Sequence, residues 1–243
     1  MDLDGQVAIV TGGAVRLGKA ISLALAGAGA KIAVHYGRSA EAAQQTLDAV
    51  TSLGVEGILI QADLRDSRKA AGTILEATIG KFGQADILVN NAAIFEAGTL
   101  SSTSEDAWER HVSINLKSPF FLSQAFAGRL KLGQRAHIVN LADWRAARPG
   151  PGHLVYTLTK SAIVTLTKSL ALELAPEVQV NAIAPGAVLL PPETDRESLD
   201  RLALQIPLHR TGSPEAITDT LLFLLRSDFV TGEVVHVTGG QEL

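Results

Sequence analysis

Short, continuously hydrophobic runs alternate along the chain with longer segments that have a helical pattern of apolar residues. Runs of this kind, rich in β-branched residues, are typical of strands that are covered on both faces. Seven of them begin at Val7, Lys31, Val55, Ala85, Ala136, Val178 and Glu233. The segments between them predict helices near residues 17–28, 40–53, 66–82, 104–132, 154–175 and 214–226.

The alternation predicts an α/β fold: a single doubly wound Rossmann domain over residues 1–243, with a seven-stranded parallel sheet flanked by helices. No linker, repeat or low-complexity tract interrupts it. Residues 189–210 form a polar, proline-punctuated insertion after the sixth strand. Ligands bind at the carboxyl ends of strands in such sheets, so we interpret this insertion as a substrate lid. A plain surface excursion is the alternative.

Composition narrows the class of protein. Hydrophobic residues make up 47% of the 243 positions, which is typical of a globular chain with a large core. The formal charge of −4 argues against nucleic acid as a partner. The absence of cysteine removes disulfides and thiolate metal sites, and the histidines lack metal-ligand spacing, so no metal is expected. An acidic start and the lack of a long apolar run predict a cytoplasmic protein without a membrane partner.

The first predicted strand ends in a glycine-rich turn, TGGAVRLG, from Thr11 to Gly18, and a helix follows at once. Gly12 and Gly13 permit a tight turn, and Gly18 permits close packing of the helix on the sheet. The first N–H groups of that helix are then free to bind a pyrophosphate. The sequence therefore predicts a dinucleotide site, the alternative being an ordinary strand–helix turn.

The end of the second strand indicates which dinucleotide binds. An NAD-binding protein would place an acid there, whereas this chain has HYGRS, from His35 to Ser39. His35, Arg38 and Ser39 could together hold a 2′-phosphate, which favours NADPH. Arg38 as a solvated surface charge is the alternative. Asp63, at the end of the third strand, is placed to meet the adenine; a helix cap shared with Asp66 is the other interpretation.

A second chemical stretch runs from Asp143 to Lys160. Tyr156 and Lys160 lie four apart, which places both side chains on one face of a helix. Asp143 ends a buried strand thirteen positions before the tyrosine. Strand end, loop and helix start would converge on one volume, which is an active site or a packed corner.

With the glycine turn, Tyr156, Lys160 and the NNAA segment at Asn90–Ala93, the chain resembles the short-chain dehydrogenase/reductase family from end to end. Three departures resemble its pteridine-reductase branch: Arg16 in the turn, Ala93 after Asn-Asn-Ala, and Asp143 in place of a serine. The resemblance implies that Phe95 stacks on a pterin ring. The PGAVLLP segment from Pro185 is similar as well.

The resemblance also assigns roles. It implies that Lys160 binds the nicotinamide ribose, that Asn115 holds a water leading to the lysine, and that the protein is a homotetramer. The predicted catalytic residues are Asp143, Tyr156, Lys160 and Asn115. The predicted substrate contacts are Arg16, Phe95, Asp143, Tyr156 and His153. The predicted NADPH/NADP+ contacts are Gly12, Arg16, Leu17, His35, Tyr36, Arg38, Ser39, Asp63, Leu64, Asn91, Ala92, Tyr156, Lys160, Pro185, Gly186 and Val188.

The residues suggest a mechanism. A free tyrosine has a pKa of about 10, and a lysine ammonium one turn away is expected to lower the pKa of Tyr156 and make it a usable acid. A carboxylate at position 143 would repel the oxyanion of a ketone reduction by about 4 kcal/mol at 4 Å with an effective dielectric near 20. Reduction of a C=N bond needs a proton on nitrogen, which Asp143 could hold or relay. The sequence therefore favours NADPH-dependent reduction of a pterin, dihydropterin or dihydrofolate.

Four alternatives stay open. The chain could be a carbonyl reductase that acts on 3-oxoacyl or other ketones, or a non-catalytic sensor that binds NADPH. Asp143 could merely cap the loop that follows it. His153 could be a solvent-exposed residue at the start of its helix.

Overall fold

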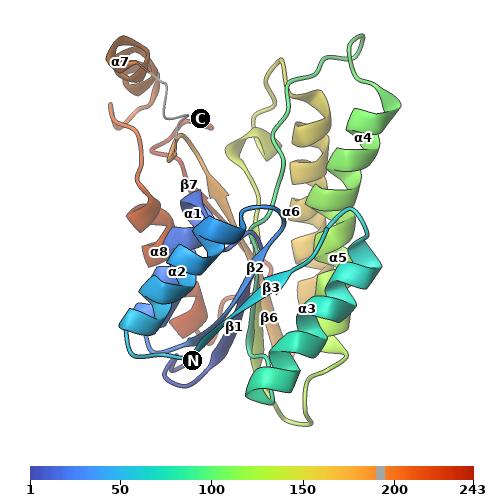
Figure 1. The fold of residues 1–243 in the computed structure, drawn as a ribbon. Coiled ribbons are helices and arrows are strands. Elements are labelled where there is room, and N and C mark those ends of the chain that lie inside the picture. Colours follow the sequence, from blue (N-terminus) through green and yellow to red (C-terminus); the bar gives the residue numbers. More distant parts are fainter. Residues whose placement is uncertain (190–194) are drawn as a thin grey trace.

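The computed structural model describes residues 1–189 and 195–243. Its sheet is parallel throughout and has the strand order β3-β2-β1-β4-β5-β6-β7 (Figure 1). The strands are β1 (Val7–Val10), β2 (Lys31–Tyr36), β3 (Gly57–Gln61), β4 (Ile87–Asn90), β5 (Ala136–Leu141), β6 (Val178–Pro185) and β7 (Val234–Val237). The reversal of strand order between β1 and β4 makes the fold doubly wound, which confirms the predicted fold class.

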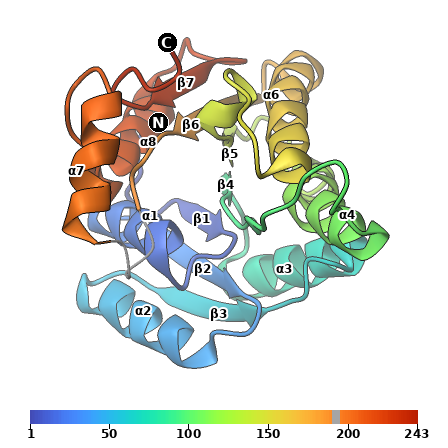
Figure 2. The ribbon, with the colours of Figure 1, turned by 90° about the horizontal axis from the view of Figure 1, so that it is seen from above.

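Helices cover both faces of the sheet (Figure 2). The helices are α1 (Arg16–Gly27), α2 (Ala40–Ser52), α3 (Ser67–Phe82), α4 (Glu105–Val112), α5 (Ser118–Ala127), α6 (Leu154–Leu174), α7 (Arg196–Gln205) and α8 (Pro214–Arg226). One core forms where α1, α2 and α8 pack on the sheet, and a second where α3, α5 and α6 pack on the other face. Every residue of β1, β4 and β5 is buried, which explains why their sequences are continuously hydrophobic rather than alternating.

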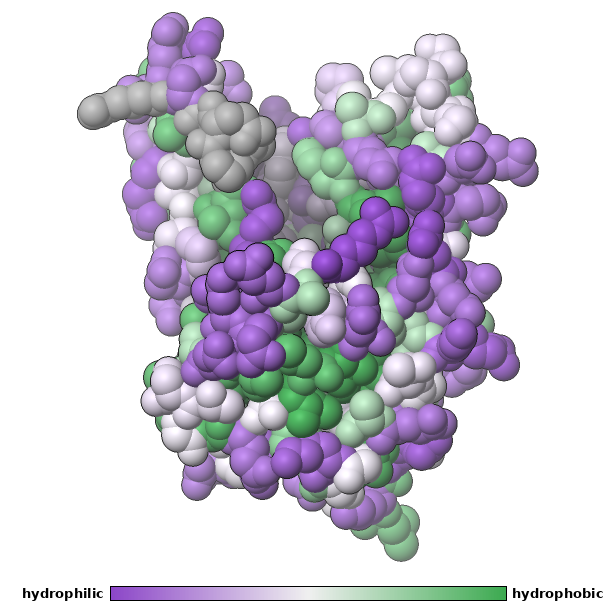
Figure 3. All heavy atoms as spheres, viewed as in Figure 1, coloured by the Kyte–Doolittle hydropathy of each residue, from purple (hydrophilic) through white to green (hydrophobic). Residues whose placement is uncertain are grey.

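The edge strands are less covered than the central ones. In Figure 3 hydrophobic side chains show between α2 and α3, where the edge strand β3 lies, within an otherwise largely hydrophilic face. Ile58 and Leu59 of β3 are only partly buried and pack against the two cores from this side. The fully buried strands are therefore the central ones, whose carboxyl ends carry the site described below.

Two predicted elements differ from the structure. The helix predicted over 104–132 is α4, then a π-helical turn over Ser113–Lys117, then α5, which ends at Ala127. The turn widens where the Asn115 side chain bonds to the main chain of Ile94 and where Pro119 follows. Within the 189–210 insertion, α7 is a helix that the sequence pattern did not predict, and residues 190–194 of the predicted lid lie outside the described residues.

Across the described ranges, none of the helices is both long and apolar enough for a membrane span. The same residues contain no group of three or more His, Cys, Asp or Glu side chains placed to hold a metal ion.

Candidate active site

A cavity of about 250 Å³ opens at the carboxyl ends of the central strands. Figure 2 looks onto this edge of the sheet, with α1 and α6 on either side. The cavity lies between the start of α1, the ends of β4, β5 and β6, and the first turns of α6. It is lined by Arg16, Leu17, Asn91, Ala93, Leu141, Ala142, Asp143, Tyr156, Lys160, Pro185, Gly186, Val188 and Leu189. Most of the predicted catalytic and nicotinamide-side residues therefore meet in one volume.

Tyr156, Lys160 and Asp143 form the polar floor of this cavity. The Tyr156 hydroxyl donates to Asp143 Oδ2 at 2.8 Å, and Lys160 Nζ donates to the main-chain oxygen of Leu141 at 2.5 Å. Lys160 Nζ lies 5.7 Å from the centroid of the Tyr156 ring. Tyr156 and Lys160 are both buried on one face of α6, as their spacing predicts.

The predicted effect of Lys160 on the pKa of Tyr156 is wrong for this structure. Burial and the neighbouring Asp143 carboxylate raise the pKa of the Tyr156 phenol instead of lowering it. Burial lowers the pKa of Lys160 to about 8, while the Asp143 carboxylate acts in the opposite direction. The sequence showed the lysine one turn away but not the closer carboxylate or the loss of water. At neutral pH Tyr156 is therefore a neutral phenol that carries a proton.

Asp143 uses its two oxygens for different purposes. Oδ1 accepts from the main-chain N–H of Arg145 at 2.9 Å and so caps the short 3₁₀ turn Trp144–Ala146. Oδ2 accepts from Tyr156. The loop cap and the tyrosine contact, which the sequence left as alternatives, are therefore both present, and the cap fixes the direction of the second oxygen.

Asn115 is buried on the π-helical turn between α4 and α5. Its Oδ1 accepts from Ile94 N at 2.9 Å, and its Nδ2 donates to Ile94 O at 3.0 Å and to Thr159 Oγ1 at 3.3 Å. These bonds anchor the segment after β4 to the helix that carries Tyr156. The water contact that the resemblance implies for Asn115 stays a prediction.

The glycine turn is tied to β4 by side chains. Thr11 Oγ1 accepts from the main-chain N–H groups of Asn91 and Ala92 at 2.9 and 3.0 Å, and Asn91 Nδ2 donates to Thr11 O at 2.8 Å. A Cβ on Gly18 would lie 2.0 Å from Gly12 O, so only glycine fits there. Because no side chain caps α1 at Val15, its first N–H groups face outward at a backbone cradle of the kind that holds a pyrophosphate.

A second cavity of about 580 Å³ lies beside this turn, and Gly12, His35, Arg38, Ser39, Asp63, Leu64 and Ala92 are among its lining residues. The prediction that His35 holds a 2′-phosphate is wrong. His35 Nδ1 accepts from Gly12 N at 3.1 Å, and Nε2 lies 3.1 Å from Ala62 O, so both ring nitrogens are occupied. Burial lowers the pKa of His35, which keeps the ring neutral. Tyr36 packs against the core rather than lining the cavity.

Arg38 and Ser39 are exposed and line the second cavity. Their exposure suits both a phosphate contact and the alternative of a solvated surface charge, so the 2′-phosphate contact stays a prediction. Asp63 is bound to Arg65, whose Nη2 lies 2.5 Å from Asp63 Oδ2. The hydrogen bonds from Arg65 are the main cause that lowers the pKa of Asp63 to about 2, and the positive charge of Arg65 adds to the effect. Neither Asp63 nor Asp66 caps α3 through its side chain, so the alternative of a shared helix cap is wrong.

Phe95 and His153 pack against each other beside Tyr156. Their rings stack at 3.9 Å with 13° between the planes, and Phe95 meets the Tyr156 ring edge-on at 4.6 Å. His153 Nδ1 lies 3.1 Å from Glu96 O, which holds the imidazole over Phe95. Phe95 is 55% exposed, and one of its faces is covered by His153. The structure therefore pairs these two predicted substrate residues with each other.

Arg16 lines the active-site cavity at the start of α1. Its backbone is in the left-handed region, with φ 51°, where a glycine is the usual residue and an arginine carries strain of about 1 kcal/mol. Its guanidinium donates to Leu189 O at 2.8 Å. The arginine therefore links the glycine turn to the segment after β6.

Sequence reasoning missed several groups that hold this site. The main-chain oxygens of Leu141 and Leu189 accept from Lys160 and Arg16, and main-chain acceptors carry no residue signal. Thr11 and Arg65 were open to detection, because a threonine before a glycine turn and an arginine two after an acid are visible in the sequence.

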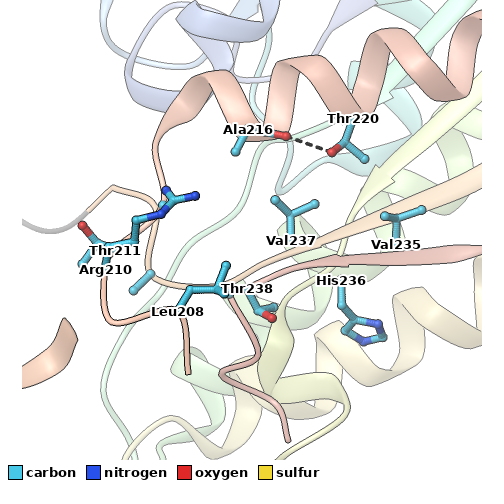
Figure 4. A pocket seen from close by; sticks show the side chains of 12 residues that line it. Leu208, Arg210, Thr211, Ala216, Thr220, Val235, His236, Val237 and Thr238 are labelled. Atoms are coloured by element: carbon cyan, nitrogen blue, oxygen red, sulfur yellow. Dashed lines mark hydrogen bonds between the residues drawn. The ribbon is translucent and has the colours of Figure 1, made fainter. Parts of the chain in front are cut away.

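A further cavity, of about 350 Å³, lies along β7 and contains none of the predicted catalytic residues. In Figure 4, Val235 and Val237 point toward α8 while His236 points away from it. The lining of this cavity comes from β7 and the two residues after it, from α8, from residues 208–212 and from Ala187. Ala187 lies between Gly186 and Val188, which line the active-site cavity.

A family model described as Enoyl-(Acyl carrier protein) reductase matches residues 13–242. A hydroxy(phenyl)methylsuccinyl-CoA dehydrogenase subunit, BbsD, of Thauera aromatica is 36% identical over 251 residues, covering 100% of this chain and 99% of the relative. The 3-oxoacyl-(acyl-carrier-protein) reductase FabG of Staphylococcus aureus is 34% identical over 238 residues, covering 96% of each chain.

Solved structures give the same relationship. FolM alternative dihydrofolate reductase 1 of Brucella canis, complexed with NADP, superposes with a TM-score of 0.93 at 30% identity, covering 99% of this chain and 95% of that one. A short-chain dehydrogenase/reductase of Serratia marcescens superposes with a TM-score of 0.93 at 33% identity over 100% of both chains. With these relatives spanning the whole chain, the protein belongs to the short-chain dehydrogenase/reductase family.

Proposed function

We propose that this protein is an NADPH-dependent reductase that adds a hydride and a proton across a C=N bond of a pterin or dihydropterin, with dihydrofolate as a further candidate. The observation that carries the proposal is the 2.8 Å hydrogen bond from the Tyr156 hydroxyl to Asp143 Oδ2. It places an acidic proton and a carboxylate side by side on the floor of the cavity.

The cofactor site fits the residues present. The backbone cradle at Gly12 and the uncapped start of α1 suit the pyrophosphate, and Arg16 and Leu17 lie at that helix start. The second strand ends without an acid and exposes Arg38 and Ser39, which suits a 2′-phosphate. When bound, NADPH supplies the hydride. Pro185, Gly186 and Val188 would flank its nicotinamide end.

Tyr156 is the proposed proton donor. Its raised pKa keeps the phenol protonated until a stronger base receives the proton, and a pterin ring nitrogen becomes such a base as hydride reaches the adjacent carbon. Lys160, with a pKa near 8, is mostly an ammonium at neutral pH and stabilises the phenolate that remains.

Asp143 is the proposed discriminator between substrates. An ionised carboxylate repels the developing oxyanion of a ketone, by about 4 kcal/mol at 4 Å with an effective dielectric near 20. The same carboxylate accepts an N–H of a pterin ring, or takes up a proton from solvent and passes it to the Tyr156 phenolate after the phenol has given its proton to the substrate. Phe95 and His153, stacked beside Tyr156, offer the exposed part of an aromatic wall to a flat ring.

The proposal is tested by following NADPH absorbance with dihydrobiopterin, dihydrofolate and an acetoacetyl thioester, using the natural chain and Asp143→Ser. We expect the natural chain to oxidise NADPH with a pterin and the variant to lose at least about tenfold in kcat/KM for it. Unchanged pterin reduction by Asp143→Ser would show that the carboxylate has no role in the chemistry.

Reduction of a 3-oxoacyl ketone is the second candidate. It is favoured by the 34% identity to the Staphylococcus aureus FabG over nearly the whole chain. The thioester assay separates the two functions, because a ketone reductase would oxidise NADPH with the thioester and not with the pterins. Oxidation with none of the three substrates would favour an NADPH-binding sensor.

We further propose that the protein is a cytoplasmic homotetramer that associates through the helices after β4 and β5. Phe120 of α5 and Leu158 and Leu172 of α6 are large apolar side chains at least 42% exposed, which gives these helices apolar surface to cover. Light scattering after gel filtration tests the assembly, and a monomeric mass would contradict it.

A further inference from the structure

Residues 239–243, which follow β7, turn back onto the active-site end of the sheet. Gly239 and Gly240 have φ values of 67° and 91°, which reverse the chain directly after Thr238. Leu208 N donates to Gly239 O at 3.2 Å, and the Thr238 hydroxyl donates to the Glu242 carboxylate. Thr238 itself lies at the end of β7 in Figure 4. The 239–243 segment is therefore held in one compact turn.

Gln241 points from this segment to the loop after β6. Its Oε1 accepts from Ala187 N at 3.0 Å, and a Cβ on Gly186 would lie 2.8 Å from the same oxygen. Because Gly186 has no side chain, the glutamine can lie directly against the main chain of residues 186 and 187.

The loop that Gln241 holds is one wall of the active-site cavity. Pro185, Gly186, Val188 and Leu189 all line that cavity. Two main-chain hydrogen bonds also hold this loop: Gly186 N donates to Val237 O at 3.0 Å, and Gly212 N donates to Ala187 O at 2.9 Å. In the described part of the chain, the side chains that bond to this loop are those of Gln241 and Arg16.

The 239–243 segment also bonds to the loop after β5. Arg148 Nη1 lies 3.5 Å from Gln241 O and donates to the main-chain oxygen of Leu243. Arg148 follows Asp143 by five residues, in the loop that begins with the 3₁₀ turn capped by Asp143. One short segment thus bonds to both loops that border the cavity.

From these contacts we infer that Gln241 is a positioning residue for the nicotinamide end of the cofactor site. It acts through Ala187 on the wall formed by residues 185–189, and Arg148 ties that arrangement to the loop that carries Asp143. The inference rests on the proposed cofactor site and not on the identity of the substrate that is reduced.

The test compares binding of two nucleotides by fluorescence and calorimetry. In the proposed cofactor site NADPH would span both cavities, whereas 2′,5′-ADP carries only the adenosine end and would not reach residues 185–189. Gln241→Ala should raise the Kd for NADPH about fivefold, the loss of one hydrogen bond, and change the Kd for 2′,5′-ADP by less than about twofold. Gln241→Glu keeps an acceptor oxygen and should bind NADPH within about twofold of the natural chain.

Gln44→Ala is the matched control, because Gln44 is an exposed glutamine of α2 whose side chain, within the described residues, bonds to Asp48 alone. Equal weakening of both nucleotides by Gln241→Ala, with a lowered melting temperature, would mean that Gln241 only stabilises the fold. Unchanged NADPH binding by Gln241→Ala, or a Gln241→Glu as weak as the alanine variant, would overturn the inference. If the natural chain binds NADPH but reduces no pterin, the proposed substrate fails and these binding results still decide the role of Gln241.

Discussion

The sheet buries ionisable side chains at both ends of its parallel strands, which we call the amino edge and the carboxyl edge. The surroundings of these side chains differ between the two edges. At the amino edge, Asp86 accepts from Val7 N at 2.8 Å and from the side-chain amides of Gln84 and Gln134 at 2.9 and 2.8 Å. All its partners are neutral donors, and they join the starts of β1 and β4 to the loop before β5. This carboxylate serves the fold.

At the carboxyl edge, Asp143, Tyr156 and Lys160 surround a cavity and act on one another. Loss of water and the neighbouring carboxylate raise the pKa of Tyr156, whereas loss of water lowers the pKa of Lys160 to about 8 against the opposing effect of that carboxylate. Displaced pKa values of neighbouring groups around a cavity are typical of sites that transfer protons. Burial of an ionisable side chain alone therefore does not indicate an active site, whereas ionisable side chains that contact one another around a cavity do.

Tyr156→Phe tests the difference between the two edges most directly, because it removes the phenolic proton and keeps the aromatic ring. We expect kcat/KM for the best substrate to fall about a thousandfold, within the range for loss of a general acid. The Kd for NADPH, measured by fluorescence, should change less than about threefold. A variant with more than a tenth of the natural activity would show that another group donates the proton.

Lys160→Met should separate activity from stability. Activity is expected to fall about a hundredfold, since the ammonium that stabilises the phenolate is lost. The free energy of unfolding should rise by about 1–3 kcal/mol, because methionine fills the same buried space without the desolvation cost of the charge. Urea unfolding at pH 7 measures this, and a clear loss of stability would mean that the bond to Leu141 O outweighs the desolvation.

Asp86→Ala should give the opposite result at the amino edge. The change leaves Val7 N and two glutamine amides without their acceptor, so the free energy of unfolding should fall by about 2 kcal/mol. The folded variant should keep its kcat/KM within about twofold when assayed well below its melting temperature. A selective loss of activity at full stability would end the distinction between the two edges.

His137, at the amino end of β5, makes the stability of the amino edge depend on pH. Burial is the main cause that lowers its pKa from 6.5 to about 4, so between these values the unfolded chain binds a proton that the folded chain does not. The stability present above pH 6.5 is therefore lost as pH falls toward 4, by about 3 kcal/mol.

His137→Leu is the matching variant. Its free energy of unfolding should depend less on pH between 6.5 and 4 than that of the natural chain, as measured by urea unfolding at several pH values. Parallel pH profiles for the two chains would show that His137 is not the group responsible.

Much of this protein was readable from its residues. The seven hydrophobic runs predicted the strands, because strands covered on both faces are mostly apolar. They did not show that the edge strands β3 and β7 are only partly buried. The glycine turn predicted a dinucleotide site, and the spacing of Tyr156 and Lys160 predicted one shared helix face, because both patterns depend on local geometry alone. The catalytic role of that face came from the family resemblance.

Tertiary structure decided what those residues experience. His35 turned inward to bond Gly12 and Ala62, Asp143 came to cap a turn and accept from Tyr156, and Gln241 met Ala187 across 54 positions. A pKa depends on the water and charge around a group, and a main-chain acceptor looks the same at every residue. Local sequence therefore determines neither the pKa values nor the main-chain partners of the site. The sequence by itself identified the residues of the site, whereas their electrostatics and their supporting hydrogen bonds arose only when distant segments packed together.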